Sequence, residues 1–364
     1  MDTLPTELFD QICMMYTGDP SPFRLVNKHW RQEHDKTLRS LKVEEGLSDI
    51  NMEYLANIME VTSLKKLCVA NVADYGVGCH LTEIGLTAIA TSRYMTCLTE
   101  LNTNWNGTVG DEGAKAIASM LSLLDLSMID NSIGDEGAWA IANGSASLTA
   151  LDLSDNRIGN EGARAIATGD SMTCLVALDL GDNIISEAGA TAIANGVSIT
   201  SLLRLCLPKN SIGDGGARAI ANGSSMTCLV HLNVHSVDSW LLNAISEVGA
   251  TAIANGVSMT LLEELNLGGN DIGDEGVRSI ANGASMKSLE ILDVLNTGMS
   301  STGAESIANG TSMGSLTHLN MSDNGIGRGV VAAFLKSAFM KSIVEVELTY
   351  TYLDMVKLRR VSRQ

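Results

Sequence analysis

The sequence has few aromatic residues and few prolines. Aromatic side chains make up 4% of the 364 residues although 45% are hydrophobic, and there are four prolines. A core built from this chain must therefore be aliphatic, mainly Leu, Ile, Ala and Val. The 35 glycines are too many for an ordinary globular domain, which indicates a regularly repeated backbone feature.

Two kinds of targeting segment are missing. The opening residues MDTLPTELFDQICMMY contain no positive region followed by a long apolar run, so no secretory signal is visible. No stretch reaches the roughly 18 uninterrupted apolar residues that a membrane span needs. We therefore expect a cytoplasmic protein that does not bind a membrane.

The residue types that carry chemistry form no catalytic or metal-binding pattern. The seven cysteines are widely spaced without a CxxC pair, which is typical of reduced thiols. His231 and His235 are four residues apart, but on a strand and loop and not on a helix face. No phosphate-binding loop or nucleophile elbow is present. We expect no enzyme activity, no cofactor and no metal.

The net charge is −18, and nearly all of the excess acid lies between residues 46 and 352. An acidic surface of this size repels the phosphate backbone, so nucleic acid is not an expected partner.

One sequence unit recurs along most of the chain. Its clearest copy is LTALDLSDNRIGNEGARAIA, residues 148–167, and the opening leucines recur at intervals of 27 residues with one interval of 33, Leu229 to Leu262. Leu151 and Leu153 alternate with polar residues, the pattern of a short strand with one buried face. The alanines and Ile166 that follow predict a helix with a small-residue face. A second period of 54 residues alternates GNEGARAIA-type with SEAGATAIA-type segments.

Three polar positions of the unit have predicted structural roles. Asn156 stands where an Asn side chain would bond backbone groups as the chain leaves the strand. Asn160 and its equivalents Asp111, Asp135, Asp214 and Asp274 are expected to cap their own helices. The recurring Asn-Gly pairs, as at 222–223, are expected to end helices with a left-handed glycine.

The pattern L-x-x-L-x-L-x-x-N-x-I resembles leucine-rich repeats of the ribonuclease-inhibitor-like class. This resemblance implies an α/β solenoid, a horseshoe with a parallel sheet inside and helices outside, over residues 46–352. The GARAIA and LDLSDN segments resemble the GALA-type repeat group. Residues 353–364 are expected to form a basic C-terminal tail.

Residues 1–45 do not fit the repeat and predict a small all-α module. The segments Leu-Pro-x-Glu-Leu at 4–8, Ile12 and Leu-Val-x-Lys-x-Trp at 25–30 resemble the F-box. In that family the motif binds the Skp-type adaptor of cullin-containing ubiquitin ligases. The resemblance assigns adaptor binding to Leu4, Pro5, Leu8, Ile12, Leu25, Val26 and Trp30.

The resemblance to F-box/leucine-rich-repeat proteins implies a substrate-recognition subunit of a Skp–cullin–F-box ubiquitin ligase. A bacterial effector acting in a host's cytoplasm or nucleus and an endogenous eukaryotic receptor both fit this architecture. A scaffold or inhibitor without a ubiquitin link is the alternative. A regulator resembling leucine-rich GTPase-activating proteins is a weaker one, because those end in an acidic tail and this chain ends in KLRRVSRQ.

The candidate target-binding residues lie on the predicted concave face. The middle residue of each L-x-L is expected to form an acidic and amide stripe, running through Asn102, Asp125, Asp152, Asp179, Cys206, Asn233, Asn266, Asp293 and Asn320. Such a stripe is either a recognition surface or plain consensus. Positions that differ between repeats are better candidates: Arg204, Lys209, His231, His235, Glu263, Glu264, Glu290 and His318. Trp240 in the 33-residue unit is expected to lie on an inserted loop, either protruding or packed, and Trp139 on the convex side.

Overall fold

A computed structural model describes residues 39–42, 48–58, 62–70, 80–144, 147–236, 243–327, 330, 342–350 and 354–359. These residues form two compact units. Unit 1 holds the described residues up to Arg157 together with Gly169–Leu175, and unit 2 holds Ile158–Thr168 and those from Val176 onward. The predicted adaptor-binding residues between 4 and 30 lie outside the described residues.

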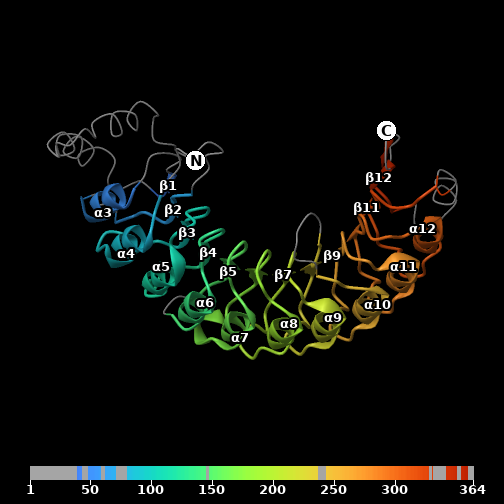
Figure 1. Ribbon diagram of the computed structural model, residues 1–364, viewed down its shortest axis with the longest axis horizontal. Coiled ribbons are helices and arrows are strands. Elements are labelled where there is room, and N and C mark those ends of the chain that lie inside the picture. Colours follow the sequence, from blue (N-terminus) through green and yellow to red (C-terminus); the bar gives the residue numbers. More distant parts are fainter. Residues whose placement is uncertain are drawn as a thin grey trace. The chain divides into compact units, whose positions relative to one another are not determined.

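Unit 1 alternates short parallel strands with helices. Its strands are hydrogen-bonded in sequence order, and the helices form a second layer beside them (Figure 1). In chain order the elements are β1 (Ser40–Lys42), α3 (Asp49–Ile58), β2 (Lys66–Cys68), α4 (Glu83–Thr91), β3 (Glu100–Asn102), α5 (Gly110–Ile117), β4 (Asp125–Ser127), α6 (Asp135–Ala142), β5 (Ala150–Asp152) and the 3-10 helix η1 (Asp170–Met172).

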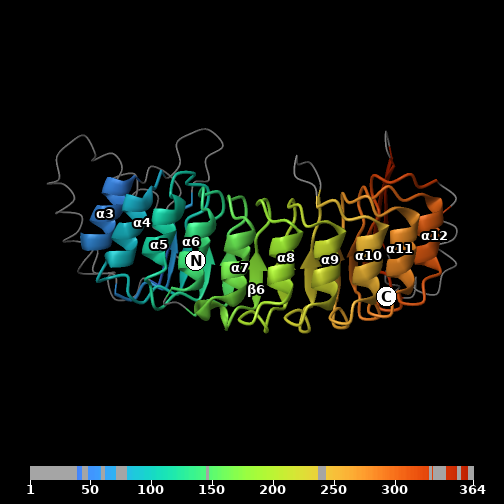
Figure 2. The same ribbon diagram turned by 60° about the horizontal axis from the view of Figure 1, so that its bottom comes forward.

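Unit 2 continues the same alternation. Its helices stand side by side in a row (Figure 2), and its strands are parallel up to β12. The elements are α7 (Asn160–Thr168), β6 (Ala177–Asp179), α8 (Glu187–Ala194), β7 (Arg204–Cys206), α9 (Gly213–Asn222), β8 (His231–Asn233), α10 (Glu247–Asn255), β9 (Glu264–Asn266), α11 (Gly273–Asn282), β10 (Ile291–Asp293), α12 (Ser301–Ala308), β11 (His318–Asn320), β12 (Glu345–Tyr350) and β13 (Asp354–Arg359).

Both predicted limits of the solenoid were wrong. At the start, β1 already pairs with β2, with Leu41 buried beside Leu67, so the sheet begins within the segment assigned to the helical module. At the end, β13 pairs antiparallel with β12, so part of the predicted tail is a strand. The sequence carries the first signal, because LRSLKV at 38–43 fits the L-x-x-L-x-L pattern with Val43 in the last place.

The core lies between the sheet and the helices of each unit. The central residue of every three-residue strand is a buried leucine, such as Leu151 in unit 1 and Leu232 in unit 2. On the helices, small alanines and an isoleucine such as Ile253 face this leucine layer and are buried. The burial of aliphatic side chains therefore confirms the expected aromatic-poor core, and the five described cysteines are free thiols.

A ladder of buried asparagines joins neighbouring repeats, as predicted from Asn156. Asn270 is typical: its Nδ2 donates to the carbonyl oxygens of Val234 and Leu267, and its Oδ1 accepts from the Ile245 N–H at 3.2 Å. Each such side chain satisfies backbone groups that the turn after the strand leaves without partners. Thr297 replaces the asparagine in one repeat.

The helix caps predicted for Asp111, Asn160, Asp214 and Asp274 were wrong in their target. Asp274 sits inside the first turn of α11, yet its carboxylate accepts hydrogen bonds from the Ser300 and Gly303 N–H groups at the start of α12, at 2.7 and 2.9 Å. Asp214 binds the start of α10 in the same way, through Ser246 and Gly249.

The same directed cap occurs at alternate repeats. It runs from Asp49 to α4 and from Asp111 to α6 in unit 1, and from Asn160 to α8 in unit 2. The 54-residue sequence period therefore has a physical cause: one repeat supplies the acceptor and the next supplies the helix that is capped.

The glycines of the Asn-Gly pairs are not left-handed. The Gly223 φ is −70° and the Gly256 φ is −69°, which any residue can adopt. Glycine is required because a Cβ on Gly223 would lie 2.2 Å from the Ala194 carbonyl oxygen of the preceding repeat. Close packing between repeats, not backbone handedness, therefore selects glycine here.

Candidate binding face

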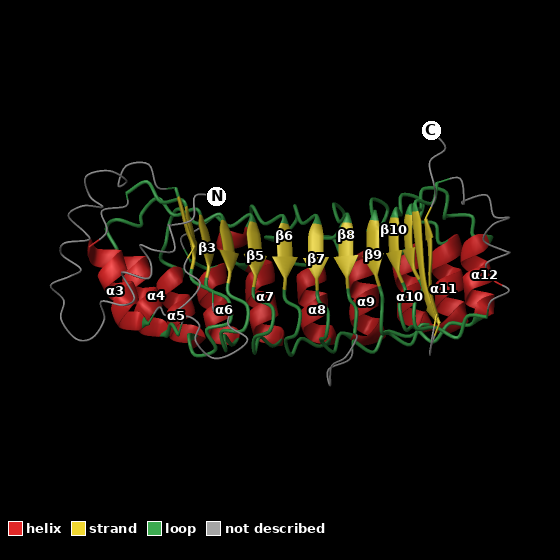
Figure 3. Ribbon diagram, turned by 90° about the horizontal axis from the view of Figure 1, so that it is seen from above, coloured by secondary structure: helices red, strands yellow, loops and turns green. Residues whose placement is uncertain are grey.

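The face of each sheet that points away from the helices is open to solvent, and we call it the open face (Figure 3). In a three-residue strand the central leucine points to the core, so the first and third residues lie on the open face. In unit 2 the first-position residues are Ala177, Arg204, His231, Glu264, Ile291 and His318, and the third-position residues are Asp179, Cys206, Asn233, Asn266, Asp293 and Asn320.

The Asp and Asn stripe at the third position has a local structural role. The Asp152 Oδ1 accepts from the Ser154 N–H in unit 1, and Asn233 accepts from His235 in unit 2. The same bond to the residue two positions later is made by Asn102, Asp179, Asn266, Asp293 and Asn320. These side chains shape the turn after each strand, which favours the consensus interpretation of the stripe.

Asp125 does not belong to the stripe. It pairs with Glu100 and Ala150, and Ser127 is the residue that pairs with Asn102 and Asp152. The prediction was one position out of register because Asp125 precedes the strand leucine, Leu126. Partial burial raises the pKa of the Asp125 carboxyl, and neighbouring Glu100 adds to this effect.

The first-position residues of unit 2 vary from strand to strand. Adjacent strands place Arg204 beside His231 and His231 beside Glu264, whose Oε2 lies 2.6 Å from the His231 Nδ1. Ile291 follows on β10 with 39% of its surface exposed, and exposed His318 follows on β11. The side chains of these residues take no part in the backbone hydrogen bonds that define the repeat, so the fold does not require their residue types.

Charge of opposite sign gathers on neighbouring strands of this face. Lys209 lies just after β7, the strand that begins with Arg204, and His235 lies just after β8. Exposed Glu263 and Glu290 lie just before β9 and β10. Lys209 is 3.6 Å from Asp182, whereas no ion pair involves Arg204, Glu263 or Glu290 among the described residues. The open face of unit 2 therefore carries a basic part over β7–β8 and an acidic part over β9–β10.

His235 has a pKa below that of an ordinary histidine. Its partial burial lowers its pKa, and the nearby Lys209 ammonium lowers it further. Its Nδ1 lies 3.0 Å from the Asn233 Oδ1. A neutral ring in this position can both donate and accept a hydrogen bond.

The six extra residues of the long repeat fall between two buried residues, Ser236 and Asn243. Ser236 and Asn243 are both buried, and the Asn243 N–H donates to the Ser236 Oγ at 2.7 Å. Asn243 also takes the ladder position, because its Nδ2 donates to the Leu207 carbonyl at 2.8 Å. The insertion is therefore residues 237–242, and Trp240 lies outside the described residues.

The structure brings most of the predicted target-binding residues onto one face. Arg204, Asn233, Glu264, Asn266, Asp293 and His318 are strand residues of the unit 2 open face, and His235 lies two residues after β8. Asp179 is on the same sheet, on β6. Asp125 and Asp152 belong to unit 1. Ile291 was not among the predicted target-binding residues. Its place at the first, exposed position of β10 follows only from the strand register.

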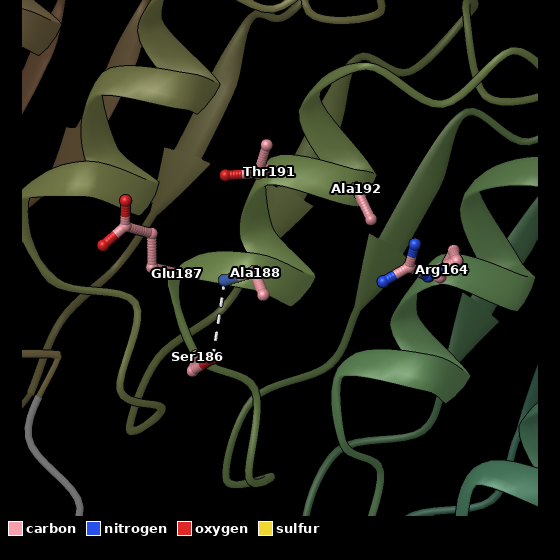
Figure 4. A pocket seen from close by; sticks show the side chains of 6 residues that line it. All are labelled: Arg164, Ser186, Glu187, Ala188, Thr191 and Ala192. Carbon is pink, nitrogen blue, oxygen red and sulfur yellow. Dashed lines mark hydrogen bonds between the residues drawn. The ribbon is translucent and has the colours of Figure 1, made fainter.

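Among the described residues, the charged side chains that line a hollow on the helix side do not form a comparable arrangement. A shallow hollow between α7 and α8 is lined by Arg164, Ser186, Glu187, Ala188, Thr191 and Ala192 (Figure 4). Its charged side chains do not converge: Arg164 bonds Glu161 on its own helix, and Glu187 lies on the other side of α8 from Arg164. Trp139 on α6 is 61% exposed, which confirms its predicted exposure.

Within the described ranges, no helix has the length and apolar content to cross a bilayer. The same residues contain no group of three or more His, Cys, Asp or Glu side chains placed to hold a metal ion.

The comparison with protein families agrees with this geometry. A leucine rich repeat family model matches residues 94–118, 119–142, 144–167, 171–194, 258–281 and 315–328. The chain carries leucine-rich repeats. The strand, asparagine ladder and helix described above are the parts of one such repeat. No curated protein sequence matches the chain.

Several solved structures are similar to this chain at low sequence identity. TLR13, in its complex with ssRNA13, is 19% identical over 85% of this chain and 39% of that chain, with a TM-score of 0.51, which shows a shared fold. An internalin (inlF) from Listeria monocytogenes is 19% identical over 83% and 86% of the two chains, with a TM-score of 0.46. PEPR1, in its structure with AtPEP1, is 17% identical over 87% and 42%, with a TM-score of 0.44. The chain thus spans less than half of the TLR13 and PEPR1 chains.

Proposed function

We propose that this leucine-rich-repeat protein is a non-catalytic binding protein that holds a target protein on the open face of unit 2. The observation that carries the proposal is the non-consensus charge over β7–β10, where Arg204 pairs with His231, His231 pairs with Glu264, and exposed Glu263 and Glu290 precede β9 and β10. Charges of opposite sign on adjacent strands give specificity for a partner with the complementary order. Leucine-rich repeats commonly present such variable strand residues on a constant scaffold.

We further propose that the N-terminal segment links this target to a ubiquitin ligase in the cytoplasm, as an F-box would. The support is the sequence match of Leu4, Pro5, Leu8, Ile12 and the 25–30 segment to the F-box pattern. In this arrangement the repeats choose the target and the ligase supplies the chemistry. The alternative is a repeat scaffold or inhibitor that binds the same target without the adaptor.

The adaptor link predicts that the full chain co-purifies with a Skp-type adaptor when the two are co-expressed. Replacing Leu4→Ala together with Pro5→Ala should reduce the recovered adaptor at least tenfold, because truncating apolar anchors removes the contacts that dominate such interfaces. Leu121→Ala is the control, since Leu121 is an exposed leucine of the repeats. If the intact chain recovers no adaptor, or the double variant recovers as much, the scaffold alternative stands.

If the target binds the open face, exchanging two charges on that face should abolish target binding although the net charge of the chain stays the same. Arg204→Glu with Glu290→Arg should lose specific proteins captured by the full chain from cell extract, measured by quantitative mass spectrometry. Arg218→Glu with Glu247→Arg makes the same swap at exposed positions on α9 and α10 and should retain them. Equal capture by both variants would assign target binding to another surface.

A further inference from the structure

A tryptophan in unit 1 occupies a backbone conformation that tryptophan disfavours. Trp105 is the third residue after β3, has a φ of +58° and is 43% exposed. The same position holds Asp130 after β4 and Asp155 after β5 in unit 1, and Lys209 after β7 in unit 2, also with positive φ. Aspartate and asparagine tolerate this left-handed region, whereas a bulky side chain there is strained. Trp105 is the aromatic residue among these positions.

The loop that carries Trp105 also leaves the asparagine ladder incomplete. The chain from Asn106 to Asp111 is one residue longer than the equivalent from Asn131 to Asp135. In this loop the Thr108 N–H bonds the Asn106 carbonyl, at 2.7 Å, and not the next asparagine side chain. The Asn131 Oδ1 is buried without a hydrogen-bond partner, whereas the equivalent Asn156 Oδ1 accepts two.

The Thr103 Oγ1 in the same loop is also buried without a partner. A buried unsatisfied oxygen and a strained backbone each cost stability. Two such oxygens and a left-handed tryptophan occur within one loop and its neighbour, while most other repeats keep the ladder. Breaks in local structural rules concentrate at functional sites, and here they occur in the loop that carries Trp105 and in the next one.

The loop is nonetheless held in place. The Trp105 N–H donates to the Ile129 carbonyl at 2.7 Å, and the Asn104 Oδ1 accepts from the Ile129 N–H at 2.8 Å. The indole is therefore displayed from an ordered backbone, so a partner would spend little conformational entropy in ordering it.

One carboxylate residue lies beside the Trp105 loop. Asp130 occupies the same position one strand away, at a spacing of about 4.8 Å between strands, and its carbonyl oxygen accepts from the Gly107 N–H at 2.9 Å. An aromatic face beside a carboxylate suits a cation that is also planar, which describes the arginine guanidinium better than the lysine ammonium.

We propose that the loop from Thr103 to Gly107 is a binding site for an arginine-bearing segment of a protein partner, with Trp105 stacking on the guanidinium and Asp130 pairing with its charge. This site is distinct from the open face of unit 2. Its failure would leave the proposed function untouched, because no residue is shared between the two sets of experiments.

The test uses the full chain with fluorescein-labelled nona-arginine, and with nona-lysine as a probe of equal charge, in fluorescence anisotropy at physiological salt. Nona-arginine should bind more tightly than nona-lysine. Trp105→Asp should weaken nona-arginine binding about fivefold, the expected size of a cation–π contact, even though the change adds a negative charge. Trp139→Asp, the same change at an exposed site on α6, should not weaken it.

The same two variants separate recognition from structure. Trp105→Asp should raise the thermal unfolding midpoint, because aspartate fits the left-handed backbone that neighbouring repeats already give to Asp130 and Asp155. If Trp105→Asp binds nona-arginine as tightly as Trp139→Asp, the attraction is general charge and the site does not exist. A lowered midpoint would show that Trp105 is a structural residue and would also overturn the proposal.

Discussion

Replacing Asn210 by alanine is expected to lower the free energy of unfolding by about 4 kcal/mol, since several buried backbone groups lose their partner at once. Asn210 is fully buried. Its Nδ2 donates to the carbonyl oxygens of Leu180 and Pro208, and its Oδ1 accepts from the Ile185 N–H at 2.9 Å. Alanine makes none of these hydrogen bonds. Because its side chain is smaller, it also leaves a cavity where the amide group was. Urea denaturation followed by circular dichroism measures the change.

Two further variants calibrate this result. Asn210→Thr should lose less, because Thr297 already fills the ladder position in another repeat and donates to the Val294 carbonyl at 3.0 Å. Asn195→Ala should cost no more than about 0.5 kcal/mol, since Asn195 is exposed and its Nδ2 only donates to Thr191 at a helix end. Equal losses for Asn195→Ala and Asn210→Ala would contradict a ladder that stabilises the repeats.

Removing the Asp274 carboxylate is expected to lower the free energy of unfolding by about 2–3 kcal/mol. The carboxylate caps a helix of the next repeat by accepting from two backbone N–H groups and one hydroxyl. Its Oδ1 accepts from the Ser300 N–H and the Gly303 N–H, and its Oδ2 accepts from the Ser300 hydroxyl. Asp274→Ala leaves these donors at the start of α12 without a partner. Asp271→Ala, an exposed aspartate three residues earlier, should change stability little.

The cap also predicts a pH dependence. Desolvation alone would raise the pKa of Asp274, but the hydrogen bonds from Ser300 and Gly303 outweigh it and leave the pKa lower than that of an ordinary aspartate. A lowered pKa in the folded state means that this stabilisation is complete above the ordinary value of about 3.9 and is lost as the pH falls through the folded value.

Asp274→Asn separates the geometry of the cap from its charge. Asn160 makes the equivalent cap onto α8 with an amide oxygen, so the variant should keep much of the stability at neutral pH. It should also lose less stability than the native chain on acidification below pH 4, in urea titrations at several pH values. A native pH profile that matches the Asn variant would contradict a stabilising carboxylate.

The leucine spacing was sufficient to predict the strands, the helices and the asparagine ladder. Period-two alternation around Leu151 and the small-residue helix face each follow from local residue types, which any single repeat contains. The cap of Asp274 could not be found this way, because its partner lies in the next repeat and the sequence fits a cap of its own helix equally well. The glycines of the Asn-Gly pairs were misassigned for the same reason, since an approach such as that of Gly223 to the Ala194 carbonyl exists only after the repeats are stacked.

Predicting the residues of the binding face required the strand register, which composition does not give. A shift of one residue moved Asp125 into the stripe and hid the equivalence of Arg204, His231 and Glu264 at the first strand position. The strand pairing fixes this register and separates residues that shape the turn from residues available to a partner. Composition alone could not make that distinction, because Asp and Asn serve both purposes.

The anchored ends of the insertion make this repeat suitable for engineering. Ser236 and Asn243 are buried and hydrogen-bonded to each other, and Asn243 restores the ladder before the chain continues into α10. With six more residues than its relatives, this repeat still returns to the ladder position at Asn243. A longer graft would add mainly the entropy of closing a larger loop, about 0.6 kcal/mol for each doubling of its length. The interval between Ser236 and Asn243 is therefore the place to insert a peptide tag, a sensor domain or a second binding sequence.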